Sequence, residues 1–289
     1  MAFVQNQEAK IYWDEQGEGE PILLIMGLGY SSVMWYRTRP ILATQYRTLA
    51  FDNRGVGRSD LLAGPYSIPL MASDAAAVLD AAKQESAHIL GISMGGMIAQ
   101  EFALAYPNRA RSLILGCTSA GGLNAVRPEP EATQMLMTRD KMSPEQAAQA
   151  ALPFIYHPAT PLTRIDEDLA VRRPWFPRPE AYVAQLQGIL AWEAYSKLPG
   201  MRVPTLVIHG EWDRLVPPAN ARIIAERIPD AELVMIPHAS HLLFTDQPAA
   251  THDAILRFLA AHANERTDAE TERHTGRMGA FRFKEPPSC

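Results

Sequence analysis

The stretch HILGISMGGMIAQ, residues 88–100, carries one serine, Ser93, between two glycines in the order G-I-S-M-G. The residues before the serine are apolar, as in a buried strand, and those after it have apolar side chains at helical spacing. A serine at such a strand-to-helix turn, with glycines that let strand and helix approach closely, is typical of a nucleophile elbow. In that turn the serine backbone is strained and its hydroxyl lies near the positive end of the helix. The pattern therefore predicts that Ser93 is a nucleophile; the alternative is a serine that caps the helix.

Apolar runs and helix-like segments alternate on both sides of this turn, and again near the end of the chain. The runs are continuously apolar, so we expect strands buried on both faces, in a mostly parallel central sheet flanked by helices. This pattern predicts an α/β fold. The expected strands are PILLIM (21–26), RTLAFD (47–52), AHILGI (87–92), RSLILGC (111–117), VPTLVIHG (203–210) and AELVMIP (231–237).

The strand rhythm stops in the middle of the chain. Residues 123–199 contain recurring prolines and short helical patterns but no convincing strand, which predicts a helical cap, or lid, inserted into the fold. The core domain would then consist of residues 1–122 and 200–263. Residues 264–289 are polar and mixed in charge, and we expect a flexible tail there.

The composition is ordinary for a soluble protein of the size of an enzyme. Of 289 residues, 47% are hydrophobic and 20% are charged, and the net charge is −5, with no basic stripe of the kind that binds nucleic acid. The N-terminal residues lack the pattern of a secretory signal, and no apolar run is long enough to span a bilayer. We therefore expect a cytoplasmic protein that binds neither nucleic acid nor membrane. Cys117, in an apolar run, is predicted to be a small core residue.

A serine hydroxyl needs a base to become nucleophilic, and the base needs an acid to orient it. VIHGEWDRLVP places Asp213 just beyond one expected strand, and VMIPHASHLLF places His241 just beyond the next. The predicted catalytic residues are therefore Ser93, Asp213 and His241, in the chain order that α/β-hydrolases use.

With these motifs, the chain resembles the α/β-hydrolase fold family over roughly residues 10–263. FDNRGVGRSD (51–60) is similar to the family's D-x-R-G-x-G-x-S segment, and residues 210–217 match its G-x-x-D-x-x-x-P run. GISMGGMIAQ and RGVGRSD are similar to the corresponding segments of 3-oxoadipate enol-lactonase-type hydrolases. The resemblance implies the α/β-hydrolase fold and a reaction without a cofactor.

The resemblance also implies roles for individual residues. His238 is a rival base, but the family places the base directly before an apolar stretch and a later Gln-Pro pair, which favours His241. The backbone N–H groups of Leu28 and Met94 would form the oxyanion hole, although Met26 stands where many relatives have histidine. The two neighbouring histidines lack the pattern of a zinc site, so no metal is expected. The sequence indicates no catalytic partner for four further histidines, His88, His157, His209 and His252.

The substrate pocket is expected near the cap. Its candidate residues are the aromatic side chains Tyr30, Trp35, Phe154, Trp175 and Trp192. For those in the cap, the alternative is that they only attach the cap to the core. Arginines of the cap could bind a substrate carboxylate or pair with acidic neighbours: Arg164, Arg172, Arg173 and Arg178, with Asp166, Glu167 and Asp168 as partners.

These features predict a serine hydrolase, with a small carboxylic ester or lactone as its substrate. Dehalogenases and epoxide hydrolases of this fold carry a carboxylate at the position of Ser93 and do not fit. Three alternatives keep the same triad: a carbon–carbon bond hydrolase, a cofactor-free haloperoxidase or perhydrolase, and a slow ligand-sensing protein that signals through a partner. Fold alone does not separate them.

Overall fold

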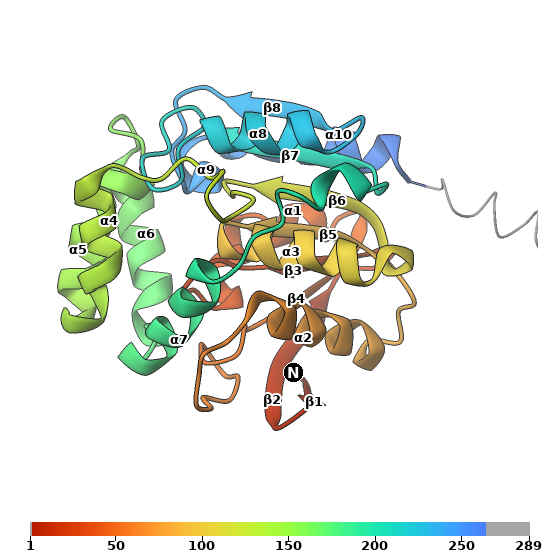
Figure 1. The fold of residues 1–289 in the computed structure, drawn as a ribbon, viewed down its shortest axis with the longest axis horizontal. Coiled ribbons are helices and arrows are strands. Elements are labelled where there is room, and N and C mark those ends of the chain that lie inside the picture. The colour runs from red at the N-terminus through yellow and green to blue at the C-terminus, as the bar shows by residue number, and fades with distance from the viewer. Residues whose placement is uncertain (1, 264–289) are drawn as a thin grey trace, which may run out of the picture.

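An eight-stranded sheet lies between two layers of helices in the computed structural model, which describes residues 2–263 (Figure 1). The strand order is β1-β2-β4-β3-β5-β6-β7-β8; β1 pairs with β2 and β2 with β4 in antiparallel fashion, and all other pairs are parallel. This sheet confirms the predicted fold class. The strands are β1 (Ala2–Asn6), β2 (Ala9–Gln16), β3 (Glu20–Ile25), β4 (Tyr46–Phe51), β5 (Ala87–Ile92), β6 (Ala110–Gly116), β7 (Thr205–Gly210) and β8 (Glu232–Ile236).

The six expected strands are all present, as β3 to β8, but β1 and β2 were not expected. These two antiparallel strands form one edge of the sheet. In β1 half-buried and exposed side chains alternate, and Phe3 is exposed. A strand with one solvent-facing side lacks the continuous apolar run from which the other strands were identified. The predicted tail, residues 264–289, lies outside the described residues.

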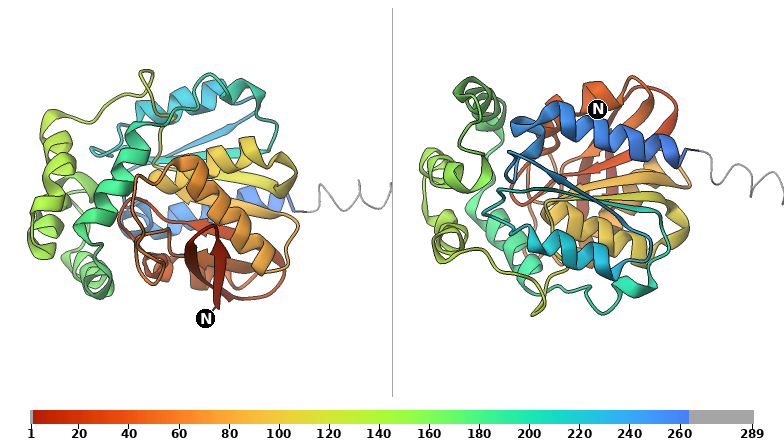
Figure 2. Two further views of the ribbon diagram at one scale, coloured as in Figure 1. Left: turned by 60° about the horizontal axis from the view of Figure 1, so that its bottom comes forward. Right: turned by 90° about the horizontal axis from the view of Figure 1, so that it is seen from above.

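Each face of the sheet has its own apolar core, and β3 contributes to both. Leu23 and Ile25 pack with helices α2, α3 and α8, whereas Ile22 and Leu24 pack with the 3-10 helix η1 and helices α1 and α10. Alternate residues of this strand therefore enter different cores, which explains its continuous hydrophobicity. Figure 2 shows helices on both faces of the sheet. The bounds are η1 (Ser32–Arg37), α1 (Arg39–Leu42), α2 (Ile68–Ala81), α3 (Met94–Ala105), α8 (Ala219–Arg227), α9 (Leu243–Asp246) and α10 (Pro248–Ala261).

The segment between β6 and β7 forms four helices grouped beside the sheet (Figure 1). It has a small apolar cluster of its own that includes Met135, Phe154 and Ile155. Its helices and short 3-10 turns are α4 (Pro130–Thr138), η3 (Arg139–Lys141), α5 (Pro144–Ile155), α6 (Leu162–Arg172), η4 (Arg173–Trp175), α7 (Pro179–Leu190) and η5 (Leu198–Gly200). Within residues 2–263, no helix has the length and apolar character needed to cross a membrane.

Helix α3 packs against the central strands without space for side chains at two glycines. A Cβ atom on Gly95 would lie 2.1 Å from the carbonyl oxygen of Ile25, and one on Gly91 would lie 2.1 Å from the carbonyl oxygen of Gly95. Both obstacles are backbone atoms, so neither can be relieved by a change of rotamer. The two glycines of the G-I-S-M-G motif are therefore required for the close contact between the central strands and α3.

We predict that Gly95→Ala lowers the free energy of unfolding by about 2–3 kcal/mol or more, because the added methyl group must push α3 away from β3. Urea unfolding followed by circular dichroism measures the change. Gly200→Ala is the matched control: no heavy atom lies within 4 Å of its added Cβ, and we expect a change within about 0.5 kcal/mol. Equal unfolding midpoints for the two variants would contradict this account of the packing.

Candidate active site

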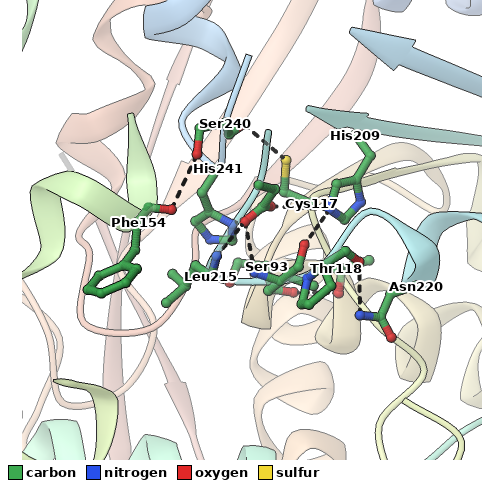
Figure 3. Close-up of polar contacts among 12 residues, drawn as sticks. Ser93, Cys117, Thr118, Phe154, His209, Leu215, Asn220, Ser240 and His241 are labelled. Carbon is green, nitrogen blue, oxygen red and sulfur yellow. Dashed lines mark hydrogen bonds and ion pairs between the residues drawn. The ribbon is translucent and has the colours of Figure 1, made fainter. Parts of the chain in front are cut away.

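Ser93 occupies the sharp turn between β5 and α3. Its backbone has φ 58° and ψ −122°, a strained conformation for a residue with a side chain. Hydrogen bonds hold the turn: the Ser93 N–H donates to the carbonyl of Gly116 at 2.8 Å, and the Thr118 hydroxyl donates to the carbonyl of Ser93 at 2.7 Å. The backbone therefore presents the Ser93 side chain at the carboxyl edge of the sheet (Figure 3).

Asp213 lies in the turn after β7 and is buried. Its Oδ1 accepts hydrogen bonds from the N–H groups of Leu215 at 2.9 Å and Val216 at 2.8 Å. Burial by itself would raise the pKa of the carboxyl, but the charge of His241 and hydrogen bonds from His209 and His241 lower that pKa well below its usual range. Asp213 is therefore a carboxylate throughout the neutral pH range.

His241 follows β8 and meets Asp213 across the end of the sheet. Its Nδ1 lies 2.8 Å from Asp213 Oδ2. An ionised carboxylate can only accept hydrogen bonds, so Nδ1 carries the proton and Nε2 is left as the basic nitrogen. Gly210 allows this approach, because a Cβ atom there would lie 2.3 Å from the carbonyl oxygen of Ser240.

The end of helix α5 helps to hold the loop that carries His241. The Ser240 hydroxyl donates to the carbonyl of Phe154 at 3.2 Å, and the Leu242 N–H donates to the carbonyl of Ile155 at 2.9 Å. Figure 3 shows the first of these contacts beside the imidazole. Residues on both sides of the predicted base are therefore tied to the inserted helices, and this link could not be read from the sequence.

Ser93 and His241 line the same cavity, which has a volume of about 120 Å³. The hydrogen bonds found among residues 2–263 do not include one between Ser93 Oγ and His241. Catalytic hydrogen bonds are often long before substrate binds, so the lack of this bond is compatible with proton transfer from Ser93 to His241 in a complex with substrate. Leu28 and Met94, the residues with the expected oxyanion-hole amides, line the same cavity.

His209 is a second histidine beside Asp213 that sequence reasoning missed. It is fully buried at the end of β7, and its Nε2 lies 3.2 Å from Asp213 Oδ2 and 2.8 Å from the carbonyl oxygen of Val216. The spacing of four residues to Asp213, in HGEWD at the end of an expected strand, was the available signal. His238, the rival base, is exposed, and its ring packs edge-on against His157 instead.

Of the five expected pocket aromatics, only Tyr30 lines the cavity. The other four are corrections: Trp35 packs against Phe244 in the core, Trp192 donates to Glu101 on α3, Trp175 stacks with Arg58, and Phe154 stacks with Arg214. Large aromatic side chains fill the joins between layers because burial of their area stabilises those contacts. The cavity wall is instead rich in methionine and aliphatic side chains: Met26, Met34, Met94, Met97, Met135, Leu136, Ile155, Leu186, Ile189, Leu215 and Leu242.

The expected partners of the acidic cluster were also wrong. Arg37, on η1, pairs with Glu167 at 2.7 Å and with Asp168 at 3.1 Å. Asp168 is buried and also accepts from Tyr156 at 3.0 Å and Thr245 at 2.6 Å. This network joins α6 to the core. It could not be predicted from the sequence, because the sequence does not show which elements meet in space.

The four arginines between β6 and β7 that were expected to meet a carboxylate do not line the cavity. Arg164 donates to the carbonyl groups of Thr245 and Asp246, and Arg172 donates to the Tyr30 hydroxyl at 2.8 Å. Neither is among the residues that line the cavity. The expectation of a substrate-binding cluster among these arginines is therefore not met by their positions.

In the described part of the chain, one group of side chains could hold a metal ion. It consists of Cys117, His209 and Asp213, whose ligand atoms lie within 4.8 Å of one another. Burial first, and then the charge of Asp213, raise the pKa of the Cys117 thiol. A protonated thiol is a poor metal ligand, and both oxygens of Asp213 already accept hydrogen bonds. The chemistry of these three residues therefore favours a role for Cys117 and His209 as buried neighbours that hold Asp213 in place, and not as ligands of a metal ion.

Comparisons with known proteins agree with the observed fold. A family model described as the alpha/beta hydrolase fold matches residues 20–248. A protein assigned as carbamate hydrolase RutD from Azorhizobium caulinodans is 33% identical over 263 residues, covering 89% of this chain and 98% of that protein. A pimeloyl-[acyl-carrier protein] methyl ester esterase from Aeromonas hydrophila is 31% identical over 250 residues, covering 84% and 96%. The structure of an enol-lactonase from Burkholderia xenovorans matches with a TM-score of 0.82 and 25% identity, covering 90% of this chain and all of that one.

We predict that Cys117 is inert in the folded protein, because it is fully buried and its raised pKa keeps it protonated. The measurement is the rate of reaction with an aromatic disulfide reagent at pH 8 in a Cys289→Ser variant, so that only one thiol is present. The folded protein should react at least about a hundredfold more slowly than the same protein in guanidinium chloride. Similar rates in the two conditions would mean that the space behind Asp213 is open to solvent.

Proposed function

The chain belongs to the α/β-hydrolase fold family, and on that premise we propose that it is a serine hydrolase that cleaves small carboxylic esters or lactones. The observation that carries the proposal is the bond between ionised Asp213 and His241 Nδ1, at a cavity that Ser93 also lines. This arrangement leaves a basic nitrogen on a residue of the same cavity as Ser93, whose hydroxyl can act as an alcohol nucleophile.

In the proposed reaction, His241 Nε2 takes the hydroxyl proton of Ser93 as the oxygen attacks the substrate carbonyl. Asp213 holds the imidazole in the required tautomer and stabilises the imidazolium that forms. His241 then returns the proton to the leaving alcohol, and the acyl group stays on Ser93 as an ester. Water, activated by the same imidazole, releases the acid and restores the serine.

The oxyanion formed in both steps would be held by the backbone N–H groups of Leu28 and Met94. Backbone amides fixed by a strand end and a helix start are already oriented before the charge develops, which is why such groups stabilise the transition state well. The position of both residues on the cavity wall supports this assignment. The absence of histidine before Gly27 does not affect it, because the donors belong to the main chain.

We propose that residues 123–199 act as the cap over this site. Met135, Leu136 and Arg139 come from this segment and line the cavity together with core residues such as Met26 and Ser93. A wall shared between insertion and core excludes bulk water from the reacting carbonyl.

A second candidate, a carbamate, is favoured by the similarity to the protein assigned as carbamate hydrolase RutD. A carbamate carbonyl would pass through the same serine, imidazole and oxyanion steps with an amine as the leaving group. A slow sensor, a carbon–carbon bond hydrolase and a perhydrolase are the further outcomes that the following experiment separates.

We predict that the wild-type protein turns over at least one substrate in a panel of short-chain esters, lactones and carbamates, and that Ser93→Ala lowers kcat roughly 10⁴-fold or more without unfolding. Continuous titration of released acid measures the esters and lactones, and an assay of the released amine measures the carbamates. Ser196→Ala, an exposed serine of the cap, is the control and should keep full activity.

Several results would count against the proposal. Full activity in Ser93→Ala would place the reaction elsewhere in the molecule. A stoichiometric burst without turnover would indicate the sensor, and activity restricted to peroxide-dependent or carbon–carbon bond cleavage would indicate the other members of the family.

A further inference from the structure

The cavity beside Ser93 is apolar, and both of its charged lining residues other than the proposed base are arginines, Arg37 and Arg139. Its lining contains no aspartate or glutamate. Arg37 is neutralised by Glu167 and Asp168, as described above. Arg139 differs, because no carboxylate in residues 2–263 lies within ion-pair distance of it.

Arg139 is also well buried. Its side chain lies on the short helix η3 of the cap, and the residue is only 8% exposed. Its Nη2 atom is buried without a hydrogen-bond partner, and the guanidinium lies 5.4 Å from the centre of the Tyr182 ring. A buried guanidinium without an anion is costly, because the energy of its lost hydration is returned only by a charged and hydrogen-bonded partner.

Tyr30, which lines the cavity, also contacts a second buried arginine. Burial raises the pKa of the Tyr30 hydroxyl, the charge of Arg139 lowers it, and the charge of Asp168, which pairs with Arg37, raises it. The same hydroxyl accepts a hydrogen bond from Arg172, which is buried, has two further nitrogens without partners and forms no ion pair among the described residues. Two buried arginines without carboxylates therefore lie close to Tyr30.

We propose that Arg139 binds a carboxylate of the substrate, at the end remote from the carbonyl that reacts with Ser93. The inference rests on the proposed hydrolase function and narrows its substrates to small esters, lactones or carbamates that also carry a free carboxylate. A guanidinium binds a planar carboxylate through two parallel hydrogen bonds, which fixes direction as well as distance. The apolar walls between the two ends would accept the hydrocarbon chain that links them.

Arg139 was not among the cap arginines expected to meet a carboxylate. The expected arginines lie between residues 164 and 178, in a segment of mixed charge. Arg139 is followed directly by Asp140, and in the sequence the two look like an ordinary charged pair at the surface. Only the three-dimensional packing shows that the guanidinium is buried against Tyr182 and borders the cavity.

The test compares monomethyl esters of C4 to C8 dicarboxylic acids with methyl esters of the monocarboxylic acids of equal length. Wild type should favour the monoester of at least one length, and Arg139→Gln should lower kcat/KM for it by about tenfold to a hundredfold. The matching neutral ester should change less than about threefold. Arg139→Lys should recover part of the loss, and Arg173→Gln, an exposed arginine of the same cap, should behave as wild type.

A binding measurement separates this inference from the proposed reaction. Calorimetry with the free dicarboxylic acid of the preferred length, or with each acid in turn if no ester is hydrolysed, should show binding to wild type and at least about tenfold weaker binding to Arg139→Gln. Without ligand, the variant should melt at the same temperature as wild type or higher, because an unpaired buried charge has been removed.

Equal losses on charged and neutral esters would overturn the inference, as would a wild type that prefers the neutral ester at every length. So would unchanged or undetectable dicarboxylate binding in both proteins, or a lower melting temperature of Arg139→Gln, which would give the arginine a structural role. Hydrolysis of neither ester set, together with no turnover in the panel of esters, lactones and carbamates, would refute the proposed function. Dicarboxylate binding that is lost in Arg139→Gln would still support the anion site.

Discussion

The close packing of helix α3 against strands β3 and β5 is the constraint on which the rest of the site depends. Gly91 and Gly95 bring backbone atoms so near that no Cβ fits at either position. The short turn between them leaves Ser93 with φ 58°. This cost in backbone strain is sustained because hydrogen bonds to Gly116 and Thr118 fix the turn from the neighbouring strand. The result is a hydroxyl held above the sheet by main-chain geometry.

The parallel sheet then explains how residues far apart in sequence meet. The strands β5, β6, β7 and β8 are neighbours in that order, so their carboxyl ends lie along one edge. Ser93 follows β5, Asp213 follows β7 and His241 follows β8. Asp213 is stable as a buried charge because two backbone amides and two histidines donate to it, an arrangement that offsets the loss of hydration.

Much of this could be predicted from sequence, for an identifiable physical reason. Strands buried on both faces are continuously apolar, so β3 to β8 were predicted correctly. Ser93, Asp213 and His241 were predicted to follow strand ends, and the structure has each of them there. The edge strand β1 alternates between half-buried and exposed side chains, and its neighbour β2 mixes buried and exposed positions, so neither has a continuous apolar run and both were missed. The family resemblance, now supported by the match over residues 20–248, decided between His238 and His241.

What could not be predicted depends on contacts between segments that the sequence does not order. Trp35, Trp175 and Trp192 are large enough to suggest a pocket, yet each packs in a join between layers or elements. His209 Nε2 lies 3.2 Å from Asp213 Oδ2, a contact that the sequence does not reveal. Arg139 looks like a surface residue in sequence, because its burial and the lack of a carboxylate within ion-pair distance among residues 2–263 arise only in the folded chain.

The central claim is that strain and hydrogen bonding make Ser93 the reactive alcohol of this chain, and covalent labelling tests it most directly. An alkyl fluorophosphonate at neutral pH should add one phosphonyl group per molecule, and peptide mass analysis should place it on Ser93. His241→Ala should abolish the labelling while the protein remains folded. A label on another residue, or equal labelling with and without the imidazole, would contradict the account.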